Sequence, residues 1–267
     1  MAKINEKYLQ TTVAIGTMVN QKHIWYATGF FIFKKLDVDP KIGIVFLITN
    51  KHVIKDKDTI WIRFFNKLTS KIDNLRISLY NSGNKPIWFS DSANDLVDIV
   101  AIPITNVTTK VMKYTSIDID DNSLTLSSFL EEGGYIGTDV FMLGFPLGLI
   151  NLENQYPMYR NGCVSAIIKS KNKYVLDIQN FPGNSGSPIF ALFDSVSIEG
   201  SKRLNNIKLI GIVNSYIPYI DNLYSSQTQK FIEQRQENSG LAYVFSTDHI
   251  KKIITPFMII SNKNYKK

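Results

Sequence analysis

The sequence is poor in the residues that crosslink a small protein or bind metal ions. It has one cysteine, Cys163, so no disulfide can form within the chain. Its three histidines do not combine with this cysteine in a zinc-binding spacing, and no phosphate-binding G-x-x-x-x-G-K-S/T segment is present. We therefore expect no metal and no other cofactor. We interpret Cys163 as a small apolar residue in a strand-like run.

Long apolar runs are also missing. No run approaches the roughly 18 apolar residues of a membrane-spanning helix. The N-terminal stretch lacks a continuous apolar segment of signal-peptide length, because Thr11, Thr12, Thr17 and Asn20 interrupt it. A single cysteine fits a reducing compartment. We therefore expect a cytoplasmic protein that does not bind membranes.

Arginine is scarce for a basic chain. The net charge is +7, but there are only five arginines, and the lysines are scattered apart from the tail Asn262–Lys267. Nucleic-acid-binding domains usually gather Lys and Arg on one face or in one run. We interpret the charge as a solvated basic surface and expect no nucleic acid. A basic nucleic-acid-binding β protein is the alternative, and a steep salt dependence of binding would favour it.

What the sequence does contain is a series of short apolar or alternating runs, separated by Gly, Asn, Asp and Ser. Most are five to eight residues long and rich in Val, Ile, Phe, Tyr and Thr. Such runs predict an all-β barrel or sandwich protein. The expected strands are Thr12–Val19, Trp25–Phe33, Ile44–Thr49, Thr59–Phe65, Ile99–Ile104, Asp139–Gly144, Cys163–Lys169, Tyr174–Ile178, Ser187–Leu192, Lys208–Val213 and Ala242–Phe245.

Helical signals are few. Ser246–Asp248 supplies N-cap residues for a terminal helix, which we expect to be interrupted at Pro256. The polar segment Thr228–Asn238 predicts a short surface helix or a loop. The acidic stretch Asp118–Gly134 is the expected joint between two halves of the chain. Long loops are expected at Lys35–Lys41, Ile150–Pro157, Asp194–Asn206 and Pro218–Gly240.

The segment Asn180–Phe190, NFPGNSGSPIF, has the composition of a serine nucleophile loop. Amide hydrolysis needs a projecting hydroxyl, converging backbone N–H groups and space for the substrate carbonyl. Gly183 can adopt a positive φ that turns its N–H inward, and Gly186 leaves room beside Ser185. The N–H groups of Gly183 and Ser185 would form the oxyanion hole. A plain Gly-Asn-Ser turn has the same composition, so this interpretation requires a base and an acid.

His52 is the candidate base. It follows the expected strand Ile44–Thr49, which would hold it rigidly at a barrel rim. Asp98, which opens the apolar run DIVAIPI, is the candidate acid that orients the imidazole, and Asp95 is its rival. The chain order His, Asp, Ser is that of chymotrypsin-like proteases and differs from that of subtilisins and α/β-hydrolases.

Eight short motifs occur in a fixed order from about residue 27 to residue 250. They are ATGFFI at Ala27–Ile32, LITNKHVI at Leu47–Ile54, DIVAI at Asp98–Ile102, LGFPLG at Leu143–Gly148, GCVSA at Gly162–Ala166, NFPGNSGSP at Asn180–Pro188, GIVNS at Gly211–Ser215 and GLAYVF at Gly240–Phe245. In these motifs the chain resembles the trypsin-like serine peptidases of bacteria, nearest the HtrA/Deg protease domain.

The resemblance implies a chymotrypsin-like fold of two six-stranded antiparallel β-barrels with a short C-terminal helix. Residues 1–122 would form the first barrel with His52 and Asp98, and residues 123–267 the second with Ser185. Together they would make one peptidase unit with the triad in the cleft. The 267 residues leave no room for the PDZ domain of many HtrA proteins, so we expect no control by such a domain.

The matched positions also carry expectations about activation and specificity. Asn184 stands where trypsinogen-like zymogens have an aspartate, so no activation by a new N-terminus is expected, and its amide could form local hydrogen bonds instead. Ser187 replaces a usual glycine and could tighten the space behind Ser185. The substrate pocket would involve Gln179, Asn180, Val213, Asn214 and Ser215. No acidic residue stands near its expected floor at Gln179, so we expect cleavage after neutral residues rather than Lys or Arg.

The sequence therefore predicts a serine endopeptidase that acts on protein or peptide substrates. A protease-fold binding module without activity is the alternative. Control by a regulatory protein partner is a further hypothesis, because a protease of this kind in the cytoplasm needs restraint.

Overall fold

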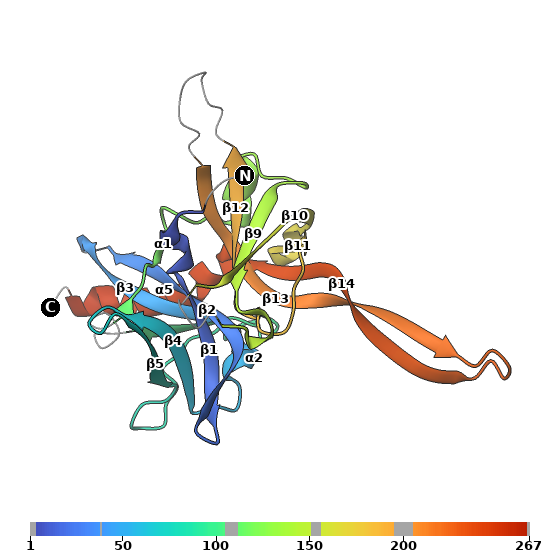
Figure 1. Ribbon diagram of the computed structural model, residues 1–267. Coiled ribbons are helices and arrows are strands. Elements are labelled where there is room, and N and C mark those ends of the chain that lie inside the picture. Colours follow the sequence, from blue (N-terminus) through green and yellow to red (C-terminus); the bar gives the residue numbers. More distant parts are fainter. Residues whose placement is uncertain (1–3, 38, 105–111, 151–155, 195–204, 266–267) are drawn as a thin grey trace.

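The computed structural model describes residues 4–37, 39–104, 112–150, 156–194 and 205–265 of the chain (Figure 1). These residues form two β-sheets, one in each half, together with a few short helices and a longer C-terminal one. The all-β class with a C-terminal helix is confirmed. No helix among the described residues is both long and apolar enough to cross a membrane.

The N-terminal sheet follows the strand order β5-β4-β1-β2-β3-β6, with neighbours antiparallel. Two short strands extend it beyond the expected six: β7 pairs with β4, and β8 pairs in parallel with β2. The strands are β1 (Thr12–Val19), β2 (Lys22–Leu36), β3 (Asp39–Thr49), β4 (Thr59–Asn66), β5 (Lys71–Ser78), β6 (Val100–Ile104), β7 (Met112–Lys113) and β8 (Ile117–Asp118).

The two edges of this sheet are joined by isolated bridges rather than by a ladder. The chain after β5 pairs Tyr80 with Pro86, and Phe89 then pairs with Ala101 of β6. The N-terminal half therefore approaches a closed barrel only through the segment between β5 and β6.

The C-terminal sheet is a closed barrel of six antiparallel strands in the order β10-β11-β14-β13-β12-β9. Its alternating side chains fill the interior, as the burial pattern of β11 shows. The strands are β9 (Asp139–Gly144), β10 (Met158–Ile168), β11 (Lys173–Asp177), β12 (Pro188–Asp194), β13 (Asn205–Tyr224) and β14 (Phe231–Ser246).

The helices are short except for the last. They are α1 (Glu6–Leu9), α2 (Lys51–Ile54), α4 (Leu126–Glu131) and α5 (Thr247–Tyr265), with 3₁₀ turns η1 (Pro146–Gly148) and η2 (Lys169–Lys171). Helix α5 begins at Thr247, within the expected N-cap residues, and Asp248 accepts hydrogen bonds from Ser246 Oγ and the Leu126 N–H, both at 2.7 Å.

One hydrophobic core is shared by the two halves. Phe30 and Phe46 of the N-terminal sheet belong to the same buried cluster as Phe141 and Phe190 of the barrel. Ile253 of α5 is part of this cluster too. The halves are therefore packed together as one body, with each sheet also holding a smaller core of its own.

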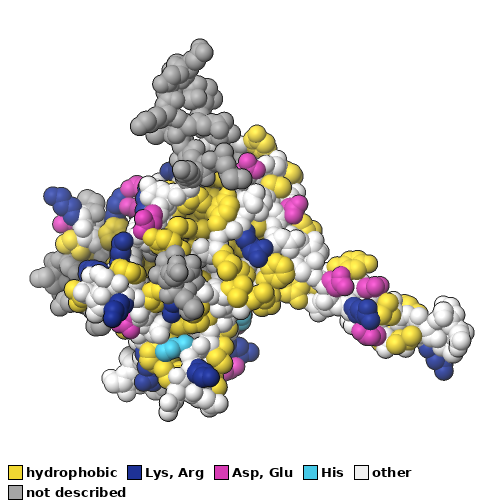
Figure 2. All heavy atoms as spheres, viewed as in Figure 1, with side chains coloured by type: hydrophobic (Ala, Val, Ile, Leu, Met, Phe, Trp, Pro, Cys, Tyr) yellow, Lys and Arg dark blue, Asp and Glu magenta, His cyan; other side chains and the backbone are white. Residues whose placement is uncertain are grey.

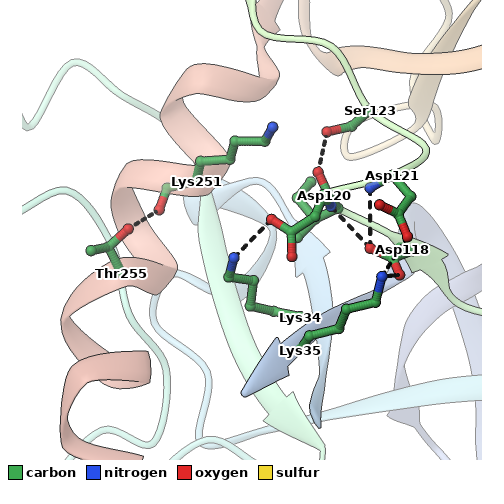
Figure 3. Close-up of polar contacts among 9 residues, drawn as sticks. Lys34, Lys35, Asp118, Asp120, Asp121, Ser123, Lys251 and Thr255 are labelled. Atoms are coloured by element: carbon green, nitrogen blue, oxygen red, sulfur yellow. Dashed lines mark hydrogen bonds and ion pairs between the residues drawn. The ribbon is translucent and has the colours of Figure 1, made fainter. Parts of the chain in front are cut away.

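The acidic stretch between the halves is tied to the end of β2 by ion pairs (Figure 3). Lys34 Nζ lies 2.7 Å from Asp120, and Lys35 Nζ lies 2.9 Å from Asp118 and also bonds Asp121. The N–H groups of Asp120 and Asp121 donate to Asp118 Oδ1, so its carboxylate caps the turn. The division into residues 1–122 and 123–267 stays a prediction, since the two halves share one core.

Three sequence expectations about the connections between strands are wrong. Lys35–Lys41 is not a long loop, because β2 runs to Leu36 and β3 starts at Asp39. Pro218–Gly240, with its supposed helix or loop Thr228–Asn238, is a strand hairpin formed by the outer parts of β13 and β14. The cross-strand pairing of this hairpin outweighs its polar composition.

The terminal helix does not stop at Pro256. It continues to Tyr265, although a proline inside a helix removes a hydrogen bond. Ile253, Ile254 and Met258 on either side of the proline are buried in the shared core. Their burial outweighs the cost of the proline. Residues 151–155 and 195–204 of two other expected loops lie outside the described residues.

Candidate active site

His52 lies on a single helical turn at the end of a buried strand. Strand β3 ends at Thr49 and α2 begins at Lys51, so the turn includes the histidine. Val53 and Ile54 anchor the turn in the core. Beneath it, Tyr26 donates a hydrogen bond to the Val53 carbonyl at 3.2 Å, and burial raises the pKa of Tyr26 to about 12. The imidazole itself is about half exposed, with 48% of its side chain accessible.

Asp98 holds both the ring and the backbone of this turn. Its Oδ2 lies 2.5 Å from His52 Nδ1, and its Oδ1 accepts the His52 N–H at 2.9 Å. The Asp98 carbonyl accepts hydrogen bonds from Asn50 Nδ2 at 2.8 Å and from the Lys51 N–H at 3.4 Å. A carboxylate can only accept, so Nδ1 carries the proton in this arrangement and Nε2 presents a lone pair.

The rival carboxylate, Asp95, lies elsewhere. Its side chain is 90% exposed, and it forms an ion pair with Lys51 Nζ at 3.0 Å. The geometry therefore places Asp98, and not Asp95, on the imidazole.

Ser185 lies on a tight loop whose two glycines adopt positive φ. Gly183 has φ +97° and Gly186 has φ +86°, a region in which a side chain would be strained. A Cβ on Gly186 would also collide with the Thr28 carbonyl and lie 2.5 Å from Thr49 Oγ1. Gly186 is thus packed against Thr49 at the end of β3. Thr49 lies three residues before His52 in the chain.

Thr28 of β2 connects the two halves of this site, and sequence reasoning did not single it out. Its N–H donates to the Ser185 carbonyl at 2.9 Å, and its hydroxyl donates to the Gly183 carbonyl at 2.7 Å. The same hydroxyl accepts from the Phe145 N–H at 3.1 Å, and Thr49 Oγ1 donates to the Thr28 carbonyl at 2.8 Å. The only sequence signal was its position inside the ATGFFI motif.

These contacts fix the carbonyls of Gly183 and Ser185 and leave their amides available. Neither N–H donates a hydrogen bond within the described part of the chain. Within the same described residues, no hydrogen bond joins Ser185 Oγ to the His52 ring; such contacts are often longer in the absence of substrate.

Two polar side chains beside Ser185 are buried and, within the described residues, form no hydrogen bond. They are Asn184 and Ser187, which are both fully buried. The expected local hydrogen bonds of the Asn184 amide are therefore not observed. Both side chains face Gly144 of β9, where a Cβ would lie 2.6 Å from Asn184 Oδ1. The residue before the nucleophile is thus neutral and enclosed.

The expected substrate-binding residues have different environments. Val213 is buried in the barrel core, and its backbone bonds Ser187 at 2.9 Å and Gly186 at 3.5 Å. It therefore aligns the nucleophile loop instead of exposing a side chain to a ligand. Asn214 is half-buried and Ser215 is exposed.

The other wall of the expected pocket is formed by Gln179 and Asn180. Gln179 is exposed, whereas Asn180 is buried and its carbonyl accepts a hydrogen bond from Asn238 Nδ2 at 2.5 Å. Asn238 belongs to β14, so the outer hairpin is tied to this wall.

No family model and no curated protein matches the sequence. Among solved structures, the apo MamO protease domain from Magnetospirillum magneticum is 14% identical, with a TM-score of 0.49 over 92% of this chain and 96% of that one. The structure of HBP, determined at atomic resolution, is 11% identical, with a TM-score of 0.48 over 95% of each chain. Identities this low do not transfer an activity, so the function is inferred below from the residues of this chain.

Proposed function

We propose that the protein is a serine endopeptidase with His52, Asp98 and Ser185 as its catalytic triad. The observation that carries the proposal is the double hydrogen bond from His52 to Asp98, which leaves Nε2 of the ring as a base. Ser185 supplies the hydroxyl on a loop tied through Thr28 and Thr49 to the strand that precedes His52.

The proposed reaction starts with attack of Ser185 Oγ on the substrate carbonyl carbon, while His52 Nε2 accepts the hydroxyl proton. Asp98 stabilises the imidazolium that forms. The carbonyl oxygen becomes an oxyanion, which the N–H groups of Gly183 and Ser185 bind. Collapse of this intermediate breaks the peptide bond, and the leaving amine takes the proton from His52. Water then attacks the acyl-enzyme by the same route and releases the acid and the free serine.

The proposed specificity is for a neutral side chain before the cleaved bond. Gln179, at the expected floor of the pocket, carries no charge. A buried Lys or Arg of the substrate would lack a counter-ion there. A protein or peptide substrate and control by a partner protein in the cytoplasm are parts of the same proposal.

The second candidate is a binding module that keeps the protease fold without turnover. The observation that favours it is the missing hydrogen bond between Ser185 and His52 within the described residues. In that case the hydroxyl would not be activated, and the loop would not react with an electrophile.

Labelling with a fluorophosphonate probe separates the two candidates. We expect the wild-type protein to be labelled and to hydrolyse casein, and Ser185→Ala to do neither while keeping its circular dichroism spectrum. Ser92→Ala, a change at an exposed serine, is the control and should behave as wild type. Labelling of Ser185→Ala, or an unlabelled wild-type protein, would overturn the proposal.

A further inference from the structure

The outer hairpin of β13 and β14 leaves the barrel as a two-stranded arm. We define the arm as Pro218–Tyr224 paired with Phe231–Asn238. Figure 1 shows it extending away from the rest of the described chain. A two-stranded ribbon without a third strand or a packed face is marginally stable in water. An arm of this length is therefore expected to gain stability from something that binds to it.

The edge of β13 in and near the arm is open. Strand β12 pairs with β13 only as far as Ile212, and among the described residues β14 is the one strand that pairs with β13 beyond Val213. Open strand edges pair readily with other extended chains, and charged side chains are a common protection. The stretch Asn214–Tyr224 has a single charged residue, Asp221, whereas the opposite strand of the arm has three in Glu233, Arg235 and Glu237. The β13 edge is therefore the less charged of the two, although Pro218 removes one backbone donor from this strand.

The two faces of the arm also differ in charge. Cross-strand pairs share a face, so Asp221 and Arg235 lie on one face together with Tyr219 and Glu237. In Figure 2 acidic and basic side chains gather along the middle of the arm. We call this the charged face.

The opposite face carries no charge. It holds Ile220 opposite Gln236, and Asn222 opposite Gln234, whose amide donates to Asn222 Oδ1 at 2.9 Å. Tyr224 continues this alternation, and its ring lies edge-on to Phe231. Ile220 is 51% exposed and Tyr224 is 57% exposed, so the uncharged face offers apolar contacts to a ligand.

The open edge leads directly to the candidate active site. The same strand supplies Val213, whose backbone holds Gly186 and Ser187 beside the nucleophile, and then Asn214 and Ser215. A chain added to this edge would therefore end beside Ser185. β13 runs outward from the site, so an added antiparallel strand, the commoner arrangement, runs inward. Its residues along the arm would precede the bond that lies at Ser185.

The resemblance already implies that Asn214 and Ser215 contact the substrate; we propose that the binding edge continues outward along the arm, from Pro218 to Tyr224, and there binds an extended segment of the polypeptide substrate on the N-terminal side of the cleaved bond. The apolar side chains of that segment lie over the uncharged face. This proposal rests on the proposed peptidase function. It makes the arm a substrate-binding element that selects unfolded chains, since only an extended backbone can pair with a strand edge.

The length of the edge sets the length of the substrate. A strand rises about 3.3 Å per residue, so a segment of roughly ten residues spans the edge. A tetrapeptide substrate would not reach the arm. A few cross-strand contacts are enough for a gain in affinity of about tenfold.

The test shortens the arm and measures binding separately from catalysis. In the shortened variant an Asn-Gly turn replaces Tyr219–Glu237, which joins the paired residues Pro218 and Asn238 and keeps the contact of Asn238 with Asn180. Binding is measured in the Ser185→Ala background with fluorescein-labelled, reduced and carboxymethylated α-lactalbumin, a permanently unfolded chain. We expect shortening to weaken this binding about tenfold. Equal affinity with and without the arm would overturn the proposal, as would no binding to either protein.

Point variants separate the two faces of the arm. Ile220→Asp on the uncharged face should weaken binding of the unfolded chain, whereas Tyr219→Asp on the charged face is the matched control. Tyr219 is 57% exposed, close to Ile220, so both changes place a charge in solvent. Equal losses in the two variants would contradict docking on the uncharged face.

The same shortened arm in the active protein distinguishes this proposal from the proposed function. Fluorophosphonate labelling and tetrapeptide hydrolysis should be unchanged, while kcat/KM for the unfolded chain falls about tenfold through KM. If the wild-type protein is not labelled, the peptidase function fails, and the binding experiment still tests the arm. If labelling is normal but both substrates are hydrolysed equally well with and without the arm, only the arm proposal fails.

Discussion

At the scale of single residues, Asp98 has two roles that are hard to separate. Its carboxylate contacts the imidazole and the backbone N–H of His52, and its carbonyl holds Asn50 and Lys51. The side chain is 24% exposed, so water competes only in part for these contacts. Asp98 therefore fixes where the ring lies as well as which nitrogen carries the proton.

An Asp98→Asn substitution should change the tautomer of the His52 ring while keeping the position of the ring. The amide keeps the shape of the carboxylate, but its NH₂ group can donate to Nδ1 and favour the tautomer with the proton on Nε2. We expect kcat to fall about 10⁴-fold, the loss known for this change in a serine protease triad. Hydrolysis of a peptide substrate measures it. Asp95→Asn is the matched control, because Asp95 forms an exposed ion pair with Lys51. A comparable loss in Asp95→Asn would show that the assignment of the acid is wrong.

The role of Thr28 could not be predicted from the sequence. The sequence predicted His52, Asp98 and Ser185 because their chemistry is distinctive and their order is that of a known triad. A threonine in a strand has no such signature. Its role follows from its two hydrogen bonds to the loop of Ser185, which lies more than 150 positions away in the chain. Only the folded chain shows that contact.

At the scale of elements, the strands with strong apolar alternation were predictable and the polar ones were not. Thr12–Val19 and Asp139–Gly144 coincide with β1 and β9. Strand β5, with the sequence KIDNLRIS, was missed because it lies at the sheet edge and buries little. The arm was missed for the same reason: its residues are mostly exposed, so no core imposes a periodic pattern on them.

Helix α5 joins the C-terminal half to the N-terminal half by an ion pair whose carboxylate is buried and by ring contacts. Lys252 Nζ lies 2.7 Å from Asp91 Oδ2, and the Asp91 side chain is 5% exposed. The Phe257 ring lies 5.5 Å from Phe46 and 4.9 Å from Phe89. The hydrogen bond from the Lys252 ammonium holds the pKa of the Asp91 carboxyl below its usual range, although burial opposes this.

This ion pair should make stability depend on pH. Because the pKa of Asp91 is lower in the folded state, its contribution is complete above the unfolded value of about 3.9 and is lost as pH falls through the folded value. We expect Asp91→Asn to lower the free energy of unfolding by about 1–2 kcal/mol at pH 7. The difference from wild type should shrink below about pH 3.9. Urea unfolding at several pH values measures it.

The control for this experiment is again Asp95→Asn. Its ion pair with Lys51 is exposed, and exposed pairs contribute little to stability. If Asp95→Asn and Asp91→Asn destabilise equally, or if the effect of Asp91→Asn does not change with pH, the ion pair with Lys252 is not what stabilises α5.

At the scale of the whole molecule, the candidate site exists only because the two halves share a core. His52 on α2 and Asp98 just before β6 come from the N-terminal half, and Ser185 comes from the loop before β12 of the barrel. Thr28 joins them by hydrogen bonds, and the cluster of Phe30, Phe46, Phe141 and Phe190 holds the sheets together behind the site. Any change that loosens this core should reduce activity before it unfolds the chain.

The N-terminal segment belongs to this shared core. Ile4, Tyr8 and Leu9 pack against it, and the Tyr8 ring lies 5.4 Å from the ring of Phe190 in an edge-on contact. Thr11 Oγ1 donates to the Tyr8 carbonyl at 2.7 Å. These contacts stabilise the fold and would be lost if the segment were cut off.

Removal of the residues before Thr11 should therefore destabilise the protein without activating it. Activation by a new N-terminus requires a buried carboxylate beside the nucleophile, because an inserted ammonium group needs a counter-ion. Asn184 occupies that position, fully buried and neutral. We expect the trimmed protein to lose about 2–4 kcal/mol of unfolding free energy, as for removal of buried apolar side chains. Its activity per fluorophosphonate-reactive molecule should not exceed that of the 267-residue chain. The measurement compares both proteins, with their N-termini confirmed by mass spectrometry, by urea unfolding and by peptide hydrolysis. A trimmed protein many times more active than the intact chain would show that the neutral Asn184 does not prevent activation from the N-terminus.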